Sequence, residues 1–199
     1  MSLSTNELPR SSIVALLYIQ ALRQGLALWF TVASGSMRPL LAIGNEIYIE
    51  PAQAHELRIG EIAAFETPQG IVVHRIVRRR KSQTTIRLLQ MADIDLYPSW
   101  IEAHDVIGRV TAVRRDSAYI DLQHPLARQM GAITAYIRYW LFRYKRYEQL
   151  GSVLHTCARA VVHLQNRWIR RCCASSLIGN ELLIKHETFE QEKQYVATE

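Results

Sequence analysis

The pattern of hydrophobic and polar positions divides the chain into three regions. Residues 1–30 carry a helical pattern, residues 31–123 contain alternating, strand-like runs, and the helical period returns across residues 124–199. The strand-like runs lie at residues 46–50, 61–65, 71–77, 84–91, 106–113 and 118–122. This order predicts an α+β fold, in which a β-rich domain lies between an N-terminal helix and a C-terminal helical extension.

The first region is expected to form a helix from Ser11 or Ser12, either of which suits an N-cap, to about Trp29. The segment is long enough to span a bilayer, but Arg23 lies at its middle, where a charge costs about 2.5–3.5 kcal/mol on insertion scales. Polar residues also form one stripe at helical spacing, at Gln20, Arg23, Gln24, Ala27 and Thr31. We therefore expect an amphipathic helix that packs on the domain or lies at a membrane surface, with a single transmembrane anchor as the alternative.

The C-terminal region is expected to begin at the His124-Pro125 pair and to contain two helices. The first helix should have one apolar face, formed by Leu126, Met130, Ile133, Ile137, Leu141 and Tyr144. The second helix should have another, formed by Leu154, Cys157, Val161, Leu164 and Trp168. Basic and aromatic residues are interspersed along the first helix, which suits an interface with an acidic partner or a solvated basic face.

Composition narrows the class of protein. Hydrophobic residues make up 49% of the 199 residues, so most of the chain should fold. The net charge of +6 is compatible with a membrane surface or with solubility alone, and we do not expect a nucleic-acid partner. The three cysteines predict no disulfide framework, which fits a reducing, cytoplasmic environment. No His/Cys cluster has zinc spacing, so we expect no metal and no cofactor, and the sequence indicates no oligomeric state.

A candidate nucleophile, Ser36, lies before the first strand-like run, in residues 34–39 with the sequence SGSMRP. A catalytic serine needs exposure, a base within hydrogen-bonding reach and donors for the oxyanion. Gly35 permits a tight turn, Pro39 opposes continuation as a helix, and Ser34 supplies a second hydroxyl close to Ser36. By itself, such a segment is more often an ordinary loop.

The candidate general base is His74, in the apolar run of residues 71–77 and after a hairpin turn predicted at residues 67–70. A lone histidine on a strand is more often a core or edge residue than a catalyst. Here the alternative base is poorly placed, because residues 1–80 contain no lysine and Lys81 lies in a charged, loop-like stretch. If a side chain activates Ser36, His74 is therefore the best-placed candidate.

Four segments across residues 31–113 resemble, in the same order, the boxes of the type I signal peptidase family. Residues 34–39 resemble the nucleophile box, and residues 60–65 (GEIAAF) resemble the Gly-Asp-hydrophobic strand. Residues 74–77 (HRIV) resemble the general-base box in the histidine form of endoplasmic-reticulum and archaeal members, and residues 106–110 (VIGRV) the strand that closes the domain. The resemblance implies a serine endopeptidase that cleaves an extended precursor or signal peptide beside a strand edge, with small side chains near the cut.

The resemblance also implies roles for single residues. Ser36 would attack, His74 would take and return the proton, and the Ser36 amide and Ser34 hydroxyl would bind the oxyanion. Met37 is assigned to the substrate-binding site with Ser34. The family's Lys-Gly-Asp box is matched only by residues 91–95 (MADID), where Asp93 is expected to orient His74 and Asp95 is the second candidate.

The sequence thus predicts a serine endopeptidase that processes a precursor, leader or signal peptide through an acyl-enzyme, in the cytoplasm or at a membrane surface. The main alternative is a non-catalytic module of the same fold that binds a peptide or a membrane surface. A self-cleaving repressor-type peptidase also shares this fold. It uses a lysine base and commonly cuts at Ala-Gly, and this chain has no Ala-Gly pair and no suitably placed lysine.

Overall fold

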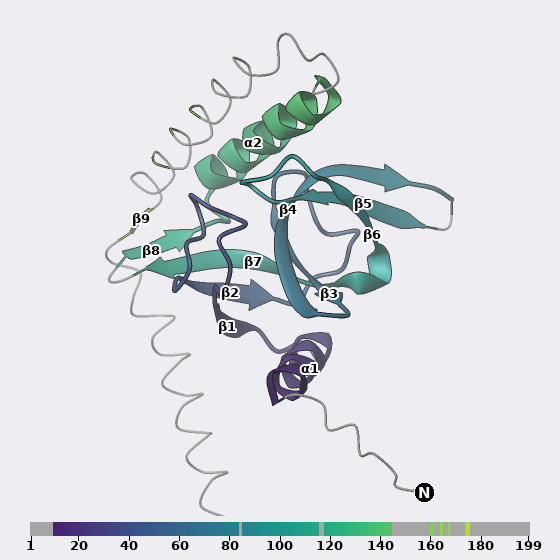
Figure 1. The fold of residues 1–199 in the computed structure, drawn as a ribbon, viewed down its shortest axis with the longest axis vertical. Helices are drawn as coiled ribbons and strands as arrows, with labels where there is room; N and C mark the ends of the chain where they lie inside the picture. The colour runs from purple at the N-terminus through teal and green to yellow at the C-terminus, as the bar shows by residue number, and fades with distance from the viewer. Residues whose placement is uncertain are drawn as a thin grey trace, which may run out of the picture.

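A computed structural model describes residues 10–83, 85–115 and 118–144, together with the isolated positions 160, 164, 167, 174 and 175. An antiparallel sheet occupies its centre, and two helices pack at opposite ends of that sheet in the view of Figure 1. The α+β class predicted from the sequence is therefore confirmed. The strands are β1 (Leu28–Thr31), β2 (Glu46–Glu50), β3 (Ile62–Thr67), β4 (Gly70–Lys81), β5 (Ile86–Met91), β6 (Ser99–Glu102), β7 (Val106–Arg115), β8 (Ala118–Asp121) and β9 (Ala174–Ser175).

The strands follow the order β1-β2-β7-β3-β4-β5-β6, and β8 pairs with β7 and with β9. The six predicted strand-like runs correspond to β2, β3, β4, β5, β7 and β8, because alternating apolar residues on a pleated strand bury one face. Three strands, β1, β6 and the two-residue β9, were not predicted, and a 3₁₀ helix, η1 (Ala103–Asp105), precedes β7. The β3–β4 hairpin turns at the predicted place, where the Thr67 hydroxyl donates to the Gly70 carbonyl over 2.9 Å.

The N-terminal helix, α1 (Arg10–Arg23), ends six residues earlier than predicted. Gly25 adopts a left-handed φ of 92°, and its N–H donates to the Leu22 carbonyl over 3.1 Å. The Leu26 N–H donates to the Ala21 carbonyl over 3.0 Å, which completes a Schellman-type helix end. The predicted end near Trp29 is wrong because this turn releases the chain into β1, where Trp29 pairs with Tyr48 of β2.

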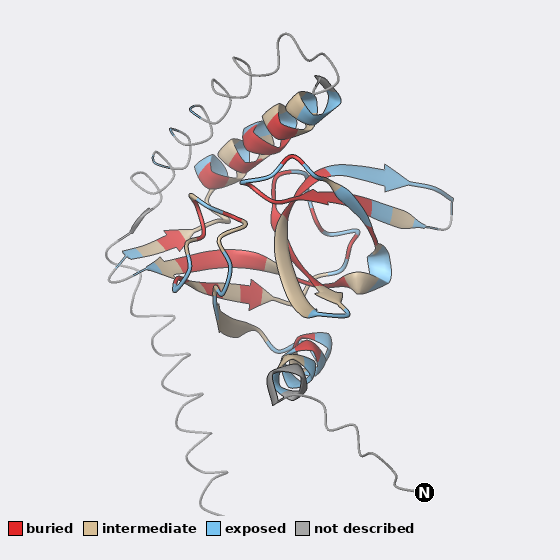
Figure 2. Cartoon of the chain, in the orientation of Figure 1, coloured by how far each residue is buried: buried red, intermediate tan, exposed pale blue. Residues whose placement is uncertain are grey.

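The helix α1 packs on the sheet through Ile19 and Leu22, which are buried. Gln20, Arg23 and Gln24 are exposed as the polar stripe predicts, and Arg23 forms an ion pair with Glu66 at 2.8 Å. The outward surface is also partly apolar, since Val14, Leu16, Leu17 and Tyr18 are exposed (Figure 2). Neither helix in the described part of the chain combines the length and the apolarity that crossing a membrane requires.

The C-terminal helix α2 (Pro125–Tyr144) begins at the predicted His124-Pro125 boundary, with proline at its first position. The predicted apolar face packs on the sheet only in part: Met130 and Leu141 contact core clusters, whereas Leu126 and Ile133 are 37% and 44% exposed. The buried face is made of small residues and one arginine, namely Ala127, Gly131, Thr134, Ala135 and Arg138. The second predicted helix, over residues 154–168, lies almost entirely outside the described residues.

Small residues are needed on α2 because its backbone approaches the sheet closely at Gly60. A Cβ atom on Gly60 would lie 2.3 Å from the Ala132 nitrogen, and one on Gly131 would lie 2.8 Å from the Gly60 oxygen. Gly60 also has a φ of 96°, which disfavours any side chain there. Beside this contact, Ala135 of α2 is buried with Val77, Met91 and Leu96 in one apolar cluster. This packing brings α2 against the chain between β5 and β6.

Candidate functional site

Ser36 lies in the loop that connects β1 and β2. The ends of this loop are joined where the Val32 N–H donates to the Asn45 carbonyl over 2.8 Å and the Gly44 N–H donates to the Val32 carbonyl over 2.9 Å. Met37 and Leu41 anchor the loop in the larger apolar core, with exposed fractions of 2% and 1%. Ser36 directly precedes the buried Met37, so its half-buried side chain is held at the rim of the sheet.

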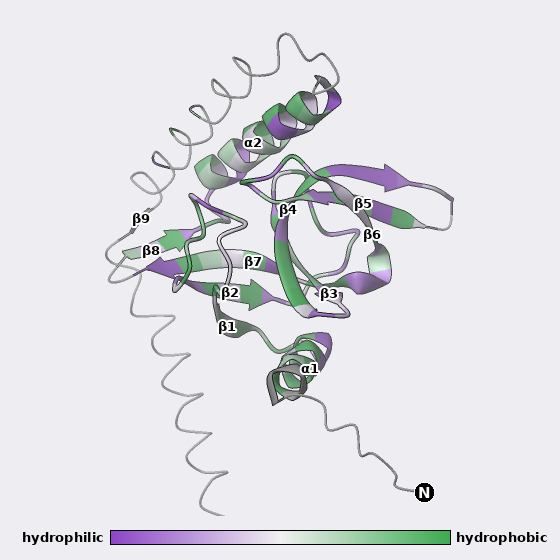
Figure 3. Ribbon diagram, viewed as in Figure 1, coloured by the Kyte–Doolittle hydropathy of each residue, from purple (hydrophilic) through white to green (hydrophobic). Residues whose placement is uncertain are grey.

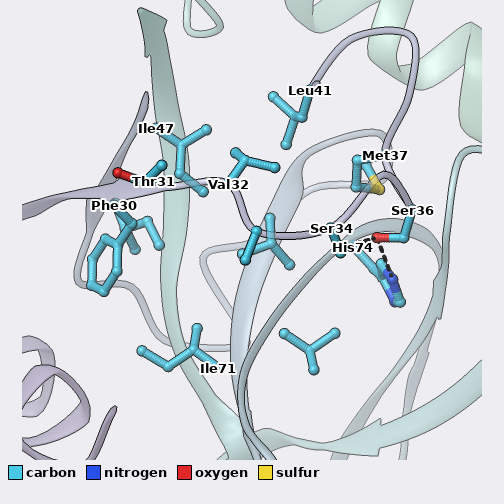
Figure 4. Close-up of a pocket in the computed structure, with 14 residues that line it drawn as sticks. Phe30, Thr31, Val32, Ser34, Ser36, Met37, Leu41, Ile47, Ile71 and His74 are labelled. Carbon is cyan, nitrogen blue, oxygen red and sulfur yellow. Dashed lines mark hydrogen bonds between the residues drawn. The ribbon is translucent and has the colours of Figure 1, made fainter. Parts of the chain in front are cut away.

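The structure brings Ser36 next to His74 of β4. The His74 Nε2 and Ser36 Oγ atoms are 3.3 Å apart, and the Ser34 Oγ lies 3.3 Å from the same Ser36 Oγ (Figure 4). The first distance is at the long end for a hydrogen bond, and catalytic hydrogen bonds commonly tighten when substrate binds. The contact joins two residues that are 38 positions apart in the sequence. Nucleophile and base candidates therefore share one site.

The other ring nitrogen of His74 contacts Gln90 of β5, at an Nδ1–Oε1 distance of 2.5 Å. An amide oxygen only accepts hydrogen bonds, so Nδ1 carries the hydrogen and Nε2 presents its lone pair to Ser36. The Gln90 amide nitrogen in turn donates to the Ser99 hydroxyl of β6, which fixes the orientation of the amide. Sequence reasoning missed both residues, since a glutamine and a serine on neighbouring strands carry no distinctive motif.

Asp93 does not take the position that the sequence analysis expected. Its carboxylate accepts two hydrogen bonds from Arg75, at 2.9 Å from Nε and 2.6 Å from an Nη nitrogen, and this pair is buried. Arg75 follows His74 on β4, so its side chain leaves the opposite face of the strand. The expectation that Asp93 orients His74 by direct contact is therefore replaced by the Gln90 contact. Asp95, the second candidate, is exposed.

Burial lowers the pKa of the His74 imidazole below its ordinary value. The hydrogen bond that His74 donates to Gln90 acts in the opposite direction, as do the negative charges of Asp93 and Asp95, but they do not cancel the effect of burial. His74 is therefore neutral at pH 7. A neutral imidazole is the form that can accept a proton from Ser36.

A cleft of about 450 Å³ opens beside Ser36 and His74 (Figure 4). Residues 30–34 form one wall, Ile71–His74 of β4 forms the other, and the interior is lined by Met37, Leu41, Ile47 and Ile49. None of the described lining residues is an acid, a lysine or an arginine. The cleft thus offers an apolar surface that ends at a polar serine–histidine pair. Met37 and Ser34, which the resemblance assigns to substrate binding, are both among the lining residues.

One wall of the cleft is also an unpaired strand edge. On its β3 side, β4 is paired over its first six residues, from Gly70 with Thr67 to Arg75 with Ile62. On the other side, the pairing with β5 begins only at Arg75, so within the described residues Ile71–His74 has no strand partner there. A free edge presents backbone N–H and C=O groups at regular spacing, which is the arrangement that accepts an extended peptide as an added strand.

The described residues contain no group of three or more His, Cys, Asp and Glu side chains that could hold a metal ion. The chemistry available at this site is that of a hydroxyl, an imidazole oriented by an amide, and an adjacent second hydroxyl.

No protein-family model matches the chain, and a search of curated proteins finds no match to it either.

Proposed function

We propose that this protein is a serine endopeptidase that cleaves an extended segment of a precursor, leader or signal peptide, as the resemblance to type I signal peptidases implies. The observation that carries the proposal is the 3.3 Å contact between Ser36 Oγ and His74 Nε2 at one end of an apolar cleft. The free edge of β4 along that cleft supports it, because the edge would hold a substrate backbone in register with Ser36.

In the proposed reaction, His74 takes the proton of Ser36 and later returns it to the departing group. The Ser36 hydroxyl passes its proton to His74 Nε2 as Oγ attacks the scissile carbonyl carbon. The tetrahedral intermediate collapses, the C–N bond breaks, and His74 gives the proton to the departing amine. Water then attacks the acyl-enzyme ester with His74 as base again, which releases the acid product and restores Ser36.

The oxyanion and the imidazolium each need stabilisation in this mechanism. The Ser34 hydroxyl and the Ser36 backbone amide are the proposed oxyanion donors, and the first lies beside the reacting oxygen. Gln90 holds the productive tautomer of His74 but carries no charge to stabilise imidazolium. The nearby charges of Asp93 and Asp95, which favour the protonated form, supply that stabilisation through space.

The test exposes wild-type protein, Ser36→Ala, His74→Ala and Ser82→Ala to a proteome-derived peptide library. New N-termini are then counted by mass spectrometry. Ser82 is an exposed serine in the β4–β5 hairpin, so Ser82→Ala is a matched control for removing a hydroxyl. We expect Ser36→Ala and His74→Ala to lose cleavage by a factor on the order of 10⁴ or more, and Ser82→Ala to retain it.

Two outcomes would contradict the proposal. Undiminished cleavage by folded Ser36→Ala protein would remove the serine mechanism at this site. Retention of library peptides by both wild-type and Ser36→Ala protein, with no cleavage by either, would favour the alternative of a non-catalytic peptide-binding module.

A further inference from the structure

We propose that Arg138 of α2 is a positioning residue of the serine–histidine site, so that the C-terminal helix is part of the catalytic unit. The inference rests on the proposed endopeptidase function. The N-terminal part of the chain and the sheet carry Ser36 and His74, while α2 contributes no residue to the cleft. Its link to the site runs through residues 92–95, the segment that directly follows β5.

Arg138 holds this segment by its backbone. One Nη nitrogen of Arg138 donates to the Ala92 carbonyl over 2.7 Å and also to the Asp95 carbonyl. The residue is only 5% exposed. Arginine is rarely buried without a partner, and here the two carbonyl groups are its partners. Two carbonyl groups three residues apart are thereby fixed to one rigid, planar group on α2.

The same segment holds Ser36. Between the two carbonyl groups that Arg138 binds, the Ile94 N–H donates to the Ser36 backbone carbonyl over 3.1 Å. The intervening Asp93 side chain is anchored by Arg75, whose guanidinium also donates to the Gly60 carbonyl over 2.8 Å. Ala92 and Asp95 are therefore attached to α2, Asp93 to β4, and Ile94 to the nucleophile loop.

The short chain from Arg138 to Ser36 therefore consists of two hydrogen-bonded steps. Arg138 fixes the carbonyl groups that flank Ile94, and Ile94 fixes the backbone of Ser36. Gln90, at the end of the strand that leads into this segment, holds His74. A displacement on the order of 1 Å between catalytic groups costs about 10²-fold in rate. Loss of Arg138 should thus lower turnover while leaving unchanged the β4 edge that is proposed to bind the peptide backbone.

The experiment compares Arg138→Met, Arg138→Lys and the control Arg128→Met with wild-type protein. Arg128 lies on the same helix and faces Glu61 at 3.6 Å, remote from residues 92–95 in its contacts. Two quantities are measured well below the unfolding temperature of each protein. These are the hydrogen-exchange rate of the Ile94 amide by NMR, and kcat and KM on a peptide that the wild type cleaves.

We expect Arg138→Met to accelerate exchange at the Ile94 amide about tenfold or more, while amides in β2 and β7 keep their wild-type rates. We expect kcat to fall about 10²-fold with KM changed little, since Ile71–Val73 are untouched. Arg138→Lys should restore part of both, because an ammonium group can donate to one carbonyl but loses its charge more readily when buried. Arg128→Met should leave both quantities unchanged.

If Arg138→Met keeps the wild-type exchange rate at the Ile94 amide and the wild-type kcat, the inference is overturned and the proposed endopeptidase function stands. If the wild type cleaves no peptide but Arg138→Met alters exchange at the Ile94 amide, the link from α2 to Ser36 is upheld and the proposed function is rejected. If Arg138→Met does not fold, Arg138→Lys is the deciding variant, with the same direction expected. Loss of folding in both variants would make Arg138 a folding residue and would overturn the positioning role.

Discussion

His74 and Arg75 are neighbours on β4, but their side chains enter very different surroundings. His74 is half-buried at an open cleft, with one hydrogen bond to Gln90 and a longer contact to Ser36. Arg75 is 2% exposed, and each of its three guanidinium nitrogens donates one hydrogen bond, two to Asp93 and one to the Gly60 carbonyl. Strand alternation separates the two environments across one layer of backbone.

Under the proposed function, the His74 face of β4 would carry the chemistry and the Arg75 face would support the fold. The His74 face keeps a neutral, titratable group beside water and a substrate-sized cleft. The Arg75 face is a buried ionic contact that fixes the segment after β5, and α2 covers it. The hairpin also changes along its length, since Figure 3 shows the hydrophilic outer part of β4 and β5 extending away from the more apolar body of the sheet. Substitutions on the Arg75 face should therefore lower the free energy of unfolding, and substitutions at the cleft should lower kcat.

The largest expected effect is on the Arg75 face. Asp93→Ala leaves a buried guanidinium without its carboxylate and should lower the free energy of unfolding by about 3–5 kcal/mol. Asp95→Ala is the matched control, because that carboxylate is exposed and should change stability by less than about 0.5 kcal/mol. Urea denaturation followed by circular dichroism measures both. Equal stability of the two variants would remove the distinction between the faces.

The corresponding variant at the cleft is Ser34→Ala. Ser34 is exposed, so the stability of the variant protein should remain near the wild-type value, whereas loss of a proposed oxyanion donor should lower kcat about 10²–10³-fold. Steady-state kinetics and a denaturation curve on the same preparation separate the two effects. A wild-type kcat would show that the Ser36 amide serves the oxyanion without the Ser34 hydroxyl.

Gln90→Ala removes the hydrogen bond that sets the His74 tautomer, without removing a charge. We expect kcat to fall about 10–10²-fold, which is less than the roughly 10²–10⁴-fold that general acid–base catalysis contributes, because the imidazole itself remains. Ser99→Ala should have a smaller effect in the same direction, because Gln90 keeps its contact with His74. Activity of Gln90→Ala equal to that of the wild type would mean that the ring is held by packing against Phe65, its T-shaped neighbour.

The smallest effect concerns the pH profile, which follows from the half-buried position of His74. Its pKa is lowered by burial, so the neutral base persists to more acidic pH than for an exposed histidine. The rate should be constant above that pKa and should fall about tenfold per pH unit below it. Asp95→Asn should move the fall to still lower pH, because the Asp95 charge raises the pKa. A midpoint above the ordinary histidine value would contradict the burial argument.

Much of the fold was predictable from local pattern. Alternating apolar residues predicted β2 at residues 46–50, where the structure has it, and the turn residues at 67–70 predicted the β3–β4 hairpin. The strand β1 was missed because its residues continue the apolar helical pattern, and only the left-handed Gly25 ends the helix. The packing of α2 was predicted only in part, since Met130 and Leu141 of the apolar face contact the core, whereas the close contact with Gly60 admits only small residues.

The sequence by itself indicated the two residues that meet, Ser36 and His74, because four segments resemble the boxes of one peptidase family in the same order and residues 1–80 contain no lysine. The tertiary structure alone decided what supports them. Antiparallel pairing places Gln90 opposite Ile76, on the face that His74 also occupies, while Asp93 lies beyond the strand and turns toward Arg75. Register is set by long-range packing of the whole sheet, so the choice between a glutamine and an aspartate three residues apart carries no local signature.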